Sequence, residues 1–311
     1  MSNSDTPANN QVALIAGPTA SGKSDLAVRL AQALDRPAVV INADSAQVYA
    51  DLQILSARPT AAEMGGVPHR LFGAWDGSKA CSAADWASAA KREIAEAHAA
   101  DAVPIIVGGT GLYIRTLLEG IAPIPAIAPD VRESVRALST TEAYTALLDE
   151  DAARADLLHP SDSQRIARAL EVVRSTGRTL AEWQEIKEGG IADEISLAPL
   201  VLLPDRDAVF ARCDGRFAMM VDNGAVGEVE ALLARDLSPD LPVMRAIGVT
   251  EIAGWLRGEW TREDALAKGQ QATRNYAKRQ FTWLRNQLPN DWVRIKPEDV
   301  DLRTNFDILF P

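Results

Sequence analysis

The sequence lacks several features that would place it outside the ordinary globular proteins. No run of about 18 apolar residues occurs in its 311 residues, so we expect no membrane span. Only two cysteines are present, Cys81 and Cys213, which excludes a zinc site built on paired cysteines and disfavours a disulfide framework. The polar N-terminus has no apolar signal region. We therefore expect a cytoplasmic protein whose residues 1–10 form a disordered leader.

Positive charge is also scarce. Lys and Arg total 32 against 43 Asp and Glu, which gives a formal net charge of −11. A protein this acidic does not resemble a general nucleic-acid binder, so any nucleic-acid site must be a local basic patch. His69 and His159 have no partners at metal-ligand spacing, and the sequence therefore predicts no zinc site.

The strongest positive signal is a glycine loop near the N-terminus. The motif G-x-x-x-x-G-K-[ST] is matched by Gly17, Pro18, Thr19, Ala20, Ser21, Gly22, Lys23 and Ser24. An apolar run at 12–16 precedes the loop and predicts a strand, and a helical apolar pattern follows at 26–34. The loop amides would face an anion, Lys23 would add a charge and the Ser24 hydroxyl could bind Mg²⁺. The motif predicts a site for a di- or triphosphate and leaves the compound open.

Two further buried strands are expected, at 37–41 and 103–107. Ligands of open parallel sheets bind beyond the carboxyl ends of the strands, which places Asp44 beside the phosphate loop. Asp is also a common N-cap before a helical turn, and the local sequence does not decide between these roles. The strand at 103–107 ends in Gly-Gly-Thr110, where most nucleotide hydrolases carry a Mg²⁺-binding acid. This disfavours a motor-type or switch-type NTPase and favours a transferase with its acid on the preceding strand, as in small-molecule kinases.

Residues 123–195 differ in character, because a proline-rich opening is followed by helical patterns without strands. We expect one of these helices to end at Gly177. The expected helix caps are Thr140 or Thr141, a capping box at Ser161–Gln164 and a second box at Thr179–Glu182. Arg165 and Arg168 lie one turn apart on one face, which by itself is more often a solvated helix face than a binding site.

A second group of cations lies on the last long helix, expected over 263–288. Arg274, Lys278 and Arg285 fall within about 40° of one another on its helical wheel. No acidic residue occurs between 265 and 290, whereas a solvated face normally carries both signs. The aligned cations therefore favour an anionic partner. Three residues on a different face are expected in the core, namely Tyr276, Trp283 and Leu284.

Six segments, in this order along the chain, resemble the bacterial tRNA dimethylallyltransferases, also called tRNA isopentenyltransferases. They are Gly17–Ser24, Asp44–Tyr49, Val67–His69, Gly108–Tyr113, Gln164–Val172 and Thr273–Gln280. The resemblance covers roughly residues 11–290. It implies an α/β fold in which a P-loop nucleotide-kinase-like parallel sheet core (11–122 and 196–311) carries an inserted all-helical domain (123–195) that clasps the anticodon stem-loop of tRNA.

The resemblance also implies a reaction. The dimethylallyl group of dimethylallyl diphosphate passes to the exocyclic amine of the adenosine immediately 3′ of the anticodon, and diphosphate leaves. The phosphate loop would hold the diphosphate, with Mg²⁺ on Ser24, and the enzyme would act as a monomer. The implied catalytic residues are Asp44, Thr110 and Arg274. The implied tRNA contacts are Asp44, Ser45, Ala46, Gln47, Thr110, Arg132, Gln164, Arg165, Ile166, Ala167, Arg168, Arg245, Arg274, Lys278 and Arg279.

The sequence departs from the family pattern at Val249 and Thr250, which stand where an aromatic residue and a cation are usual. Three other functions compete with this assignment: a small-molecule kinase, an adenylate isopentenyltransferase acting on free AMP, and a non-catalytic RNA-binding scaffold. The helical segment argues against the first two. The intact Gly22-Lys23-Ser24 argues against the third.

Overall fold

The structure, a computed structural model, describes residues 10–310, so the leader predicted at 1–10 lies outside the described residues except for Asn10. The chain divides into two compact units. One combines the chain up to Leu117 with the chain from Ala192 onward, and the other is Leu118–Ile191. Within residues 10–310, no helix has both the length and the apolar character needed to cross a membrane.

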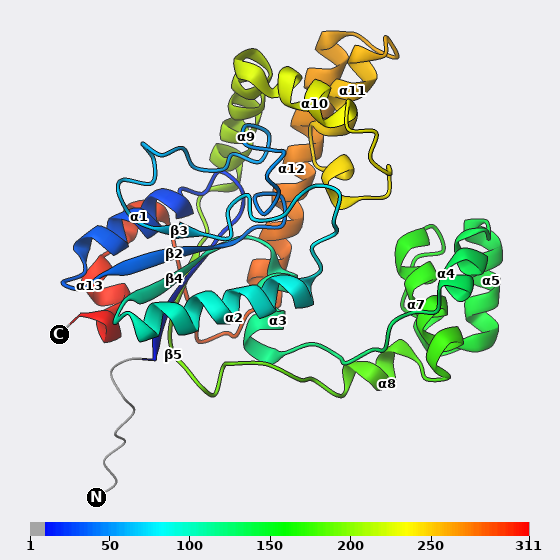
Figure 1. Cartoon of the computed structure of the whole chain (residues 1–311), viewed down its shortest axis with the longest axis horizontal. Helices are drawn as coiled ribbons and strands as arrows, with labels where there is room; N and C mark the ends of the chain where they lie inside the picture. The colour runs from blue at the N-terminus through cyan, green and yellow to red at the C-terminus, as the bar shows by residue number, and fades with distance from the viewer. Residues whose placement is uncertain (1–9, 311) are drawn as a thin grey trace, which may run out of the picture. The chain divides into compact units, whose positions relative to one another are not determined.

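The first unit is built on a six-stranded parallel sheet with the order β3-β2-β4-β1-β5-β6 (Figure 1). Its strands are β1 (Gln11–Ala16), β2 (Ala38–Ala43), β3 (His69–Arg70), β4 (Val103–Gly108), β5 (Ser196–Leu202) and β6 (Val293–Ile295). Every residue of β2 and β4 is buried, as expected for parallel strands covered on both faces. The predicted α/β fold with a parallel sheet is confirmed.

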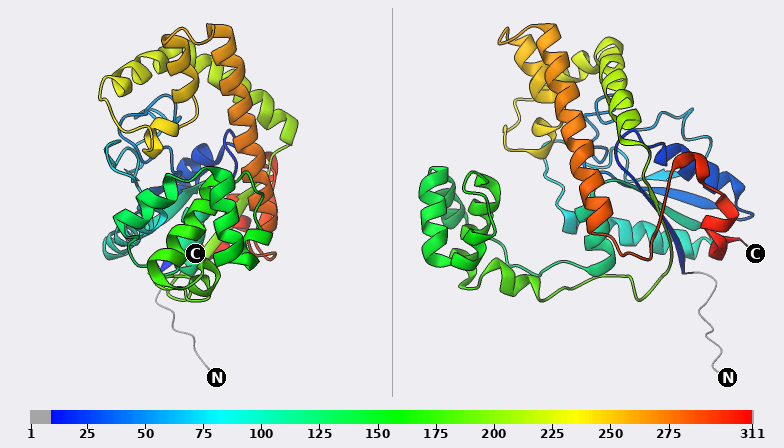
Figure 2. Two further views of the ribbon diagram at one scale, coloured as in Figure 1. Left: turned by 90° about the vertical axis from the view of Figure 1, so that its right-hand side faces the viewer. Right: turned by 180° about the vertical axis from the view of Figure 1, so that it is seen from behind.

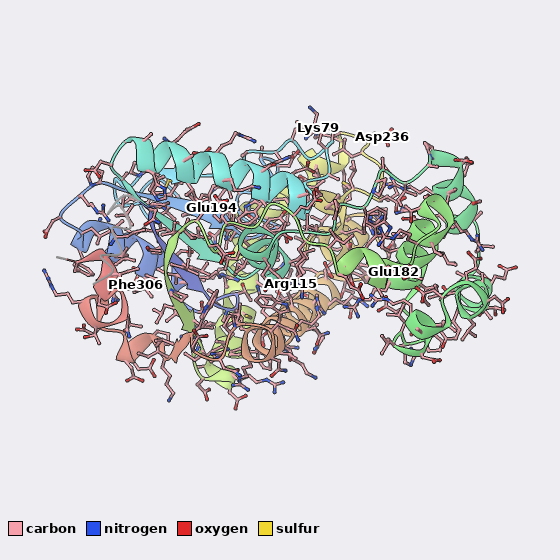
Figure 3. The ribbon with its side chains drawn as sticks, turned by 90° about the horizontal axis from the view of Figure 1, so that it is seen from below. Lys79, Arg115, Glu182, Glu194, Asp236 and Phe306 are labelled. Atoms are coloured by element: carbon pink, nitrogen blue, oxygen red, sulfur yellow. The ribbon has the colours of Figure 1, made fainter. Side chains whose placement is uncertain are left out.

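Helices cover both faces of this sheet (Figures 1 and 3). On one face, α1 (Lys23–Ala33) packs Leu30 and its neighbours against alternate strand residues, and Phe306 from the C-terminal turns joins the same cluster. On the other face lies α2 (Ala83–Ala99), which begins at a capping box formed by Ser82 and Asp85. The Trp86 indole of α2 donates a hydrogen bond of 2.7 Å to the Asn42 carbonyl of β2. These contacts fix the carboxyl ends of the strands, where the polar residues gather.

Two long helices, α9 (Arg206–Met220) and α12 (Arg262–Asn286), run side by side next to the phosphate loop (Figure 2). Their shared core packs against Ala20 of that loop and consists of Val209, Cys213, Ala277 and Phe281. The remaining helices of this unit are α3 (Gly111–Glu119), α10 (Val226–Leu233), α11 (Val249–Leu256) and α13 (Leu302–Asn305). A kinked segment, Val221–Ala225, joins α9 to α10.

The second unit is built from α4 (Pro129–Arg136), α5 (Thr140–Glu150), α6 (Ala152–Asp156), α7 (Ser163–Thr176) and α8 (Leu180–Gln184). Its core includes Val135, Leu147 and Leu170, all at most 1 % exposed. The predicted end of α7 at Gly177 and the capping box that begins at Thr179 are confirmed.

Two predicted caps of this unit are wrong. Ser139, rather than Thr140 or Thr141, caps α5 with Glu142, because Ser139 is the last residue with extended backbone before the first turn. Asp162, rather than Ser161, caps α7, and its carboxylate accepts from the Arg165 amide at 3.2 Å. In both cases the sequence offered adjacent residues that can cap, and the position of the first helical turn decided between them.

Candidate functional site

The phosphate loop holds a buried cation. Lys23 is 8 % exposed and its Nζ donates to the Pro18 carbonyl at 3.1 Å. Burial lowers the pKa of Lys23 to about 8, against the opposing effect of the nearby Asp44 carboxylate. The buried Ser21 hydroxyl has no hydrogen-bond partner among residues 10–310. An anion in the loop would satisfy both groups, because it would neutralise the Lys23 charge and accept from Ser21.

A side chain of α12 holds the loop in place. Gln280 is 4 % exposed, and its Oε1 accepts from the Thr19 amide at 2.8 Å. Its Nε2 donates to the Gly109 carbonyl at 3.1 Å. Gln280 therefore ties the phosphate loop to the end of β4. The sequence analysis did not give Gln280 this role, because nothing local to residue 280 shows which loops its amide reaches.

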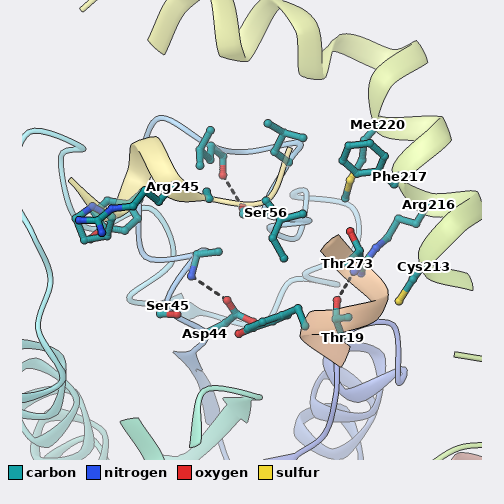
Figure 4. Close-up of a pocket in the computed structure, with 18 of the residues that line it drawn as sticks. Thr19, Asp44, Ser45, Ser56, Cys213, Arg216, Phe217, Met220, Arg245 and Thr273 are labelled. Atoms are coloured by element: carbon teal, nitrogen blue, oxygen red, sulfur yellow. Dashed lines mark hydrogen bonds between the residues drawn. The ribbon is translucent and has the colours of Figure 1, made fainter. Parts of the chain in front are cut away.

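Arg216 of α9 is a second cation at the loop; it is partly buried, and no sequence motif indicated it. Its Nη2 donates to the Thr19 hydroxyl (Figure 4). Burial lowers the pKa of Arg216, and the nearby Cys213 and Asp44 act in the opposite direction. The sequence did contain an indication of this role. Arg216 borders the buried face of α9, where charged residues are rare unless they are paired; that face is formed by Val209, Cys213 and Phe217.

Asp44 and Thr110 follow β2 and β4 and lie close together. Asp44 is 8 % exposed, and its Oδ1 accepts from the Ala46 amide at 2.9 Å. Residues 45–48 form turns, so no helix follows that Asp44 could cap. The Thr110 hydroxyl accepts from the Ser45 amide at 2.9 Å. This bond joins the loops after β2 and β4 and fixes the backbone beside the Asp44 carboxylate.

The Asp44 carboxylate and the phosphate loop, through Thr19, border one cavity of about 330 Å³ (Figure 4). Its polar lining includes Thr19, Asp44, Ser45 and Arg216, and its apolar lining includes Leu52, Leu55, Phe217, Met220 and Ile247. The cavity thus joins the phosphate loop and an acid to an apolar wall. That arrangement suits a phosphorylated substrate with an apolar reacting group.

Tyr276 also lines this cavity, so its predicted place in the core is wrong. Its hydroxyl interacts with Thr110 and Ser45, and burial raises its pKa. A buried Tyr hydroxyl usually finds a hydrogen-bond partner, and the partners of Tyr276 are polar residues of the site. Leu284 is fully buried as predicted, whereas Trp283 is partly exposed.

The predicted tRNA residues of the first unit divide into two groups. Those that line the cavity are Asp44, Ser45, Ala46, Arg245 and Arg279. Outside that lining, Gln47 donates from its Nε2 to the Ser56 and Ala57 carbonyls at 3.0 and 3.1 Å, within its own loop. Arg274 pairs with Asp214 of α9 and donates to Gln271 at 2.7 Å, while Lys278 is exposed. The catalytic role of Arg274 stays a prediction that the cavity lining does not support.

The predicted tRNA residues of the second unit lie on α7 and α4. Gln164 and Arg165 are exposed, and Arg165 pairs with its neighbour Asp162 at 3.4 Å. Arg168 is partly buried, with Arg132 and Glu171 close to its charge. Ala167 is partly buried beside it. Ile166 is fully buried in the core, which leaves no side-chain surface for RNA.

The donor atoms at the phosphate loop fit Mg²⁺ bound with a diphosphate. The described residues contain no group of three or more His, Cys, Asp or Glu able to hold a metal. Mg²⁺ in phosphate sites usually takes only one or two protein oxygens and draws the rest from phosphate and water. The partly buried Ser24 hydroxyl supplies a donor of that kind.

The sequence profile of a family described as IPP transferase matches residues 47–287. The chain belongs to the IPP transferase family. Two relatives are the tRNA dimethylallyltransferases of Erythrobacter litoralis, 66 % identical over 302 residues, and of Zymomonas mobilis, 55 % identical over 295 residues. The alignments cover 96 % of this chain and 95 % of the first relative, and 95 % of this chain and 94 % of the second.

Solved structures agree with this IPP transferase assignment. The tRNA isopentenylpyrophosphate transferase of Bacillus halodurans is 32 % identical, with a TM-score of 0.68 over 96 % of this chain and 94 % of that one. A eukaryotic dimethylallyltransferase acting on tRNA is 28 % identical, with a TM-score of 0.75 over 88 % of this chain and 70 % of that one. The resemblance found in the sequence is therefore confirmed.

Proposed function

We propose that the protein transfers the dimethylallyl group of dimethylallyl diphosphate to the exocyclic amine of the adenosine immediately 3′ of the anticodon in tRNA. The observation that carries this proposal is that Thr19 of the phosphate loop, Arg216 of α9 and the acid Asp44 border one cavity. The adenine amine is a poor nucleophile because its lone pair is delocalised into the ring. An allylic diphosphate compensates by ionising readily, so the site must hold the leaving diphosphate and accept one proton.

The leaving diphosphate is held by Lys23 of the loop and Arg216 of α9. Lys23 is buried and Arg216 is partly buried, so water only weakly screens their attraction for the developing negative charge. The Ser21 hydroxyl donates to a phosphate oxygen that replaces its missing partner. Ser24 would hold Mg²⁺, which when bound would partly neutralise the negative charge of the diphosphate oxygens.

The accepting amine is placed by the residues after β2 and β4. Asp44 hydrogen-bonds the amine and takes its proton as the C–N bond forms, because it is the acid that lines the cavity. Thr110 keeps the Ser45 backbone in place through their 2.9 Å bond. The adenosine must leave the base stack to reach this cavity, at a cost of about a few kcal/mol, less in a loop than in a duplex.

The helical unit Leu118–Ile191 is assigned to the anticodon stem-loop. The cations Arg132, Arg165 and Arg168 supply phosphate contacts in an otherwise acidic protein. In the first unit, Arg245 and Arg279 line the cavity and are suited to the nucleotides beside the target adenosine. The enzyme acts on tRNA in the cytoplasm as a monomer.

One assay separates this function from its competitors. The purified protein is incubated with labelled dimethylallyl diphosphate and offered unmodified tRNA, AMP or no acceptor. Label in tRNA alone is the expected result. Label in AMP would indicate an adenylate isopentenyltransferase, and ATP consumption without prenyl transfer would indicate a kinase. Binding of tRNA without either reaction would indicate a scaffold.

A further inference from the structure

The carboxylate of Glu228 on α10 binds three consecutive backbone amides of a loop that borders the cavity. It accepts from Gln53 at 2.6 Å, Ile54 at 2.6 Å and Leu55 at 3.0 Å. Successive amides that converge on one anion form a binding concavity, and hydrogen bonds to a charged acceptor are about twice as strong as neutral ones. The loop is therefore fastened to α10 through its backbone at a single carboxylate.

Two of these residues, Ile54 and Leu55, are also held by their side chains. Gly224, in the kink before α10, has φ of 112°, and a Cβ there would lie 2.8 Å from Ile54 Cδ1. Gly248, just before α11, has φ of 97°, and a Cβ there would lie 2.5 Å from Leu55 Cδ2. Both glycines supply a backbone conformation that other residues rarely adopt, and each leaves room for the end of one side chain. Ile54 and Leu55 fill that room.

The loop also contains a cation, Arg58, in the electrostatic surroundings of Glu228. Arg58 lies near enough for Glu228 to raise its pKa, against the larger effect of burial, which lowers it. Its Nε donates to the Gln53 side chain at 2.5 Å and its Nη1 to the Tyr49 carbonyl at 3.1 Å. Arg58 organises the loop internally, and Glu228 attaches that organised loop to α10.

The loop supplies part of the cavity's apolar wall. Leu52, Leu55 and Ser56 line the cavity, and the Ser56 hydroxyl donates to the Leu52 carbonyl at 2.5 Å (Figure 4). Phe217 and Met220 of α9 belong to the same apolar lining. The prenyl group is the apolar part of the donor, so the apolar wall limits how long that group can be.

We infer that Glu228 is a positioning residue that fixes this wall and thereby limits the donor to a five-carbon prenyl group. The inference rests on the proposed function. If the three hydrogen bonds from the backbone amides to Glu228 are weakened, Leu55 is no longer held in position. The cavity then accepts longer prenyl chains. A hydrophobic pocket discriminates against one additional methylene by about tenfold or more in kcat/KM. The loss of a fixed wall should therefore change the donor selectivity measurably.

The test compares Glu228→Gln with Glu230→Gln, which removes a charge from an exposed position on the same helix. The amide group of Gln keeps the size of Glu but offers a neutral acceptor and an N–H that repels the loop amides. The ratio of kcat/KM for dimethylallyl over geranyl diphosphate is measured with unmodified tRNA. We expect this ratio to fall about tenfold in Glu228→Gln and to stay unchanged in Glu230→Gln.

Hydrogen exchange gives an independent readout. The amides of Gln53, Ile54 and Leu55 should exchange slowly in the wild type and faster in Glu228→Gln. Fast exchange of these amides in the wild type would overturn the inference even if the variant failed to fold. An unchanged donor ratio in a folded variant would overturn it as well, since a purely structural role lowers stability without changing selectivity. A wild-type protein that transfers no prenyl group would refute the proposed function instead.

Discussion

Replacing Lys23 by Met should stabilise the protein while abolishing binding of the diphosphate. A pKa lowered from its usual 10.5 to about 8 corresponds to about 3 kcal/mol of unfavourable burial, at 1.36 kcal/mol per pH unit. Met has a similar length and carries no charge. The absence of the hydrogen bond to the Pro18 carbonyl offsets about 1 kcal/mol of the gain. Unliganded Lys23→Met should therefore be about 2 kcal/mol more stable than the wild type at pH 7.

The pH dependence of the folding stability follows from the same Lys23 amine. Below about pH 8 Lys23 is protonated in both the folded and the unfolded state, so the wild type carries the full burial cost. Between about pH 8 and 10.5 the unfolded state binds more protons than the folded state, and wild-type stability should rise with pH. Lys23→Met should lack this rise, because it has no titrating group at that position.

Urea unfolding of both proteins between pH 6 and 10.5 measures these differences, with calorimetry for diphosphate and for tRNA. Lys79→Met is the matched control, because Lys79 lies exposed on the surface (Figure 3). The control should match the wild type in stability, in the pH dependence of that stability, and in its affinity for diphosphate and tRNA. A Lys23→Met protein less stable than the wild type at pH 7, with the same rise above pH 8, would refute the burial argument. Loss of tRNA affinity with intact diphosphate binding would refute the assignment of the loop.

Three further predictions concern the acid, the missed cation and the RNA-binding arginines. Asp44→Asn should lower the single-turnover rate by about 10²–10⁴-fold; a folded variant within about threefold of the wild type would leave Asp44 with only its turn bond to Ala46. Arg216→Gln should weaken diphosphate binding by at least about tenfold in calorimetry, as expected for a partly buried charge-assisted contact, while tRNA affinity is kept; equal diphosphate affinity would remove Arg216 from the site. Arg165→Ala with Arg168→Ala should flatten the slope of log tRNA affinity against log salt by about 0.7–0.9 for each phosphate that is no longer neutralised, and an unchanged slope would mark that pair as a solvated helix face.

The sheet and the phosphate loop could be predicted because their signals are local. Gly17–Ser24 is a contiguous motif, and the buried strands are apolar runs bounded by turn residues. The position of Asp44 also followed from a general rule, since ligands of parallel sheets bind beyond the carboxyl ends of the strands. In each of these cases neighbouring residues carry the information.

The rest of the site could not be read in this way, because it depends on which surfaces meet. Tyr276 has the spacing of a core residue on α12, yet its hydroxyl reaches Thr110 some 160 residues earlier in the chain. Arg216 and Gln280 approach the same Thr19 from two helices. A cation on a helix face gives no local indication of its partner, so Arg274 and Arg216 could be told apart only after α9 and α12 were packed.

The bonds made by α12 have a consequence for how this enzyme can change. Tyr276 touches the acceptor side through Thr110, Arg279 lines the cavity, and Gln280 holds the phosphate loop. These three residues lie within about 6 Å along one rigid helix. A displacement of α12 therefore disturbs the donor and the acceptor together. Substitutions in α12 will therefore impair binding of the donor and of the acceptor together. A change of specificity for one substrate alone cannot be obtained through this helix.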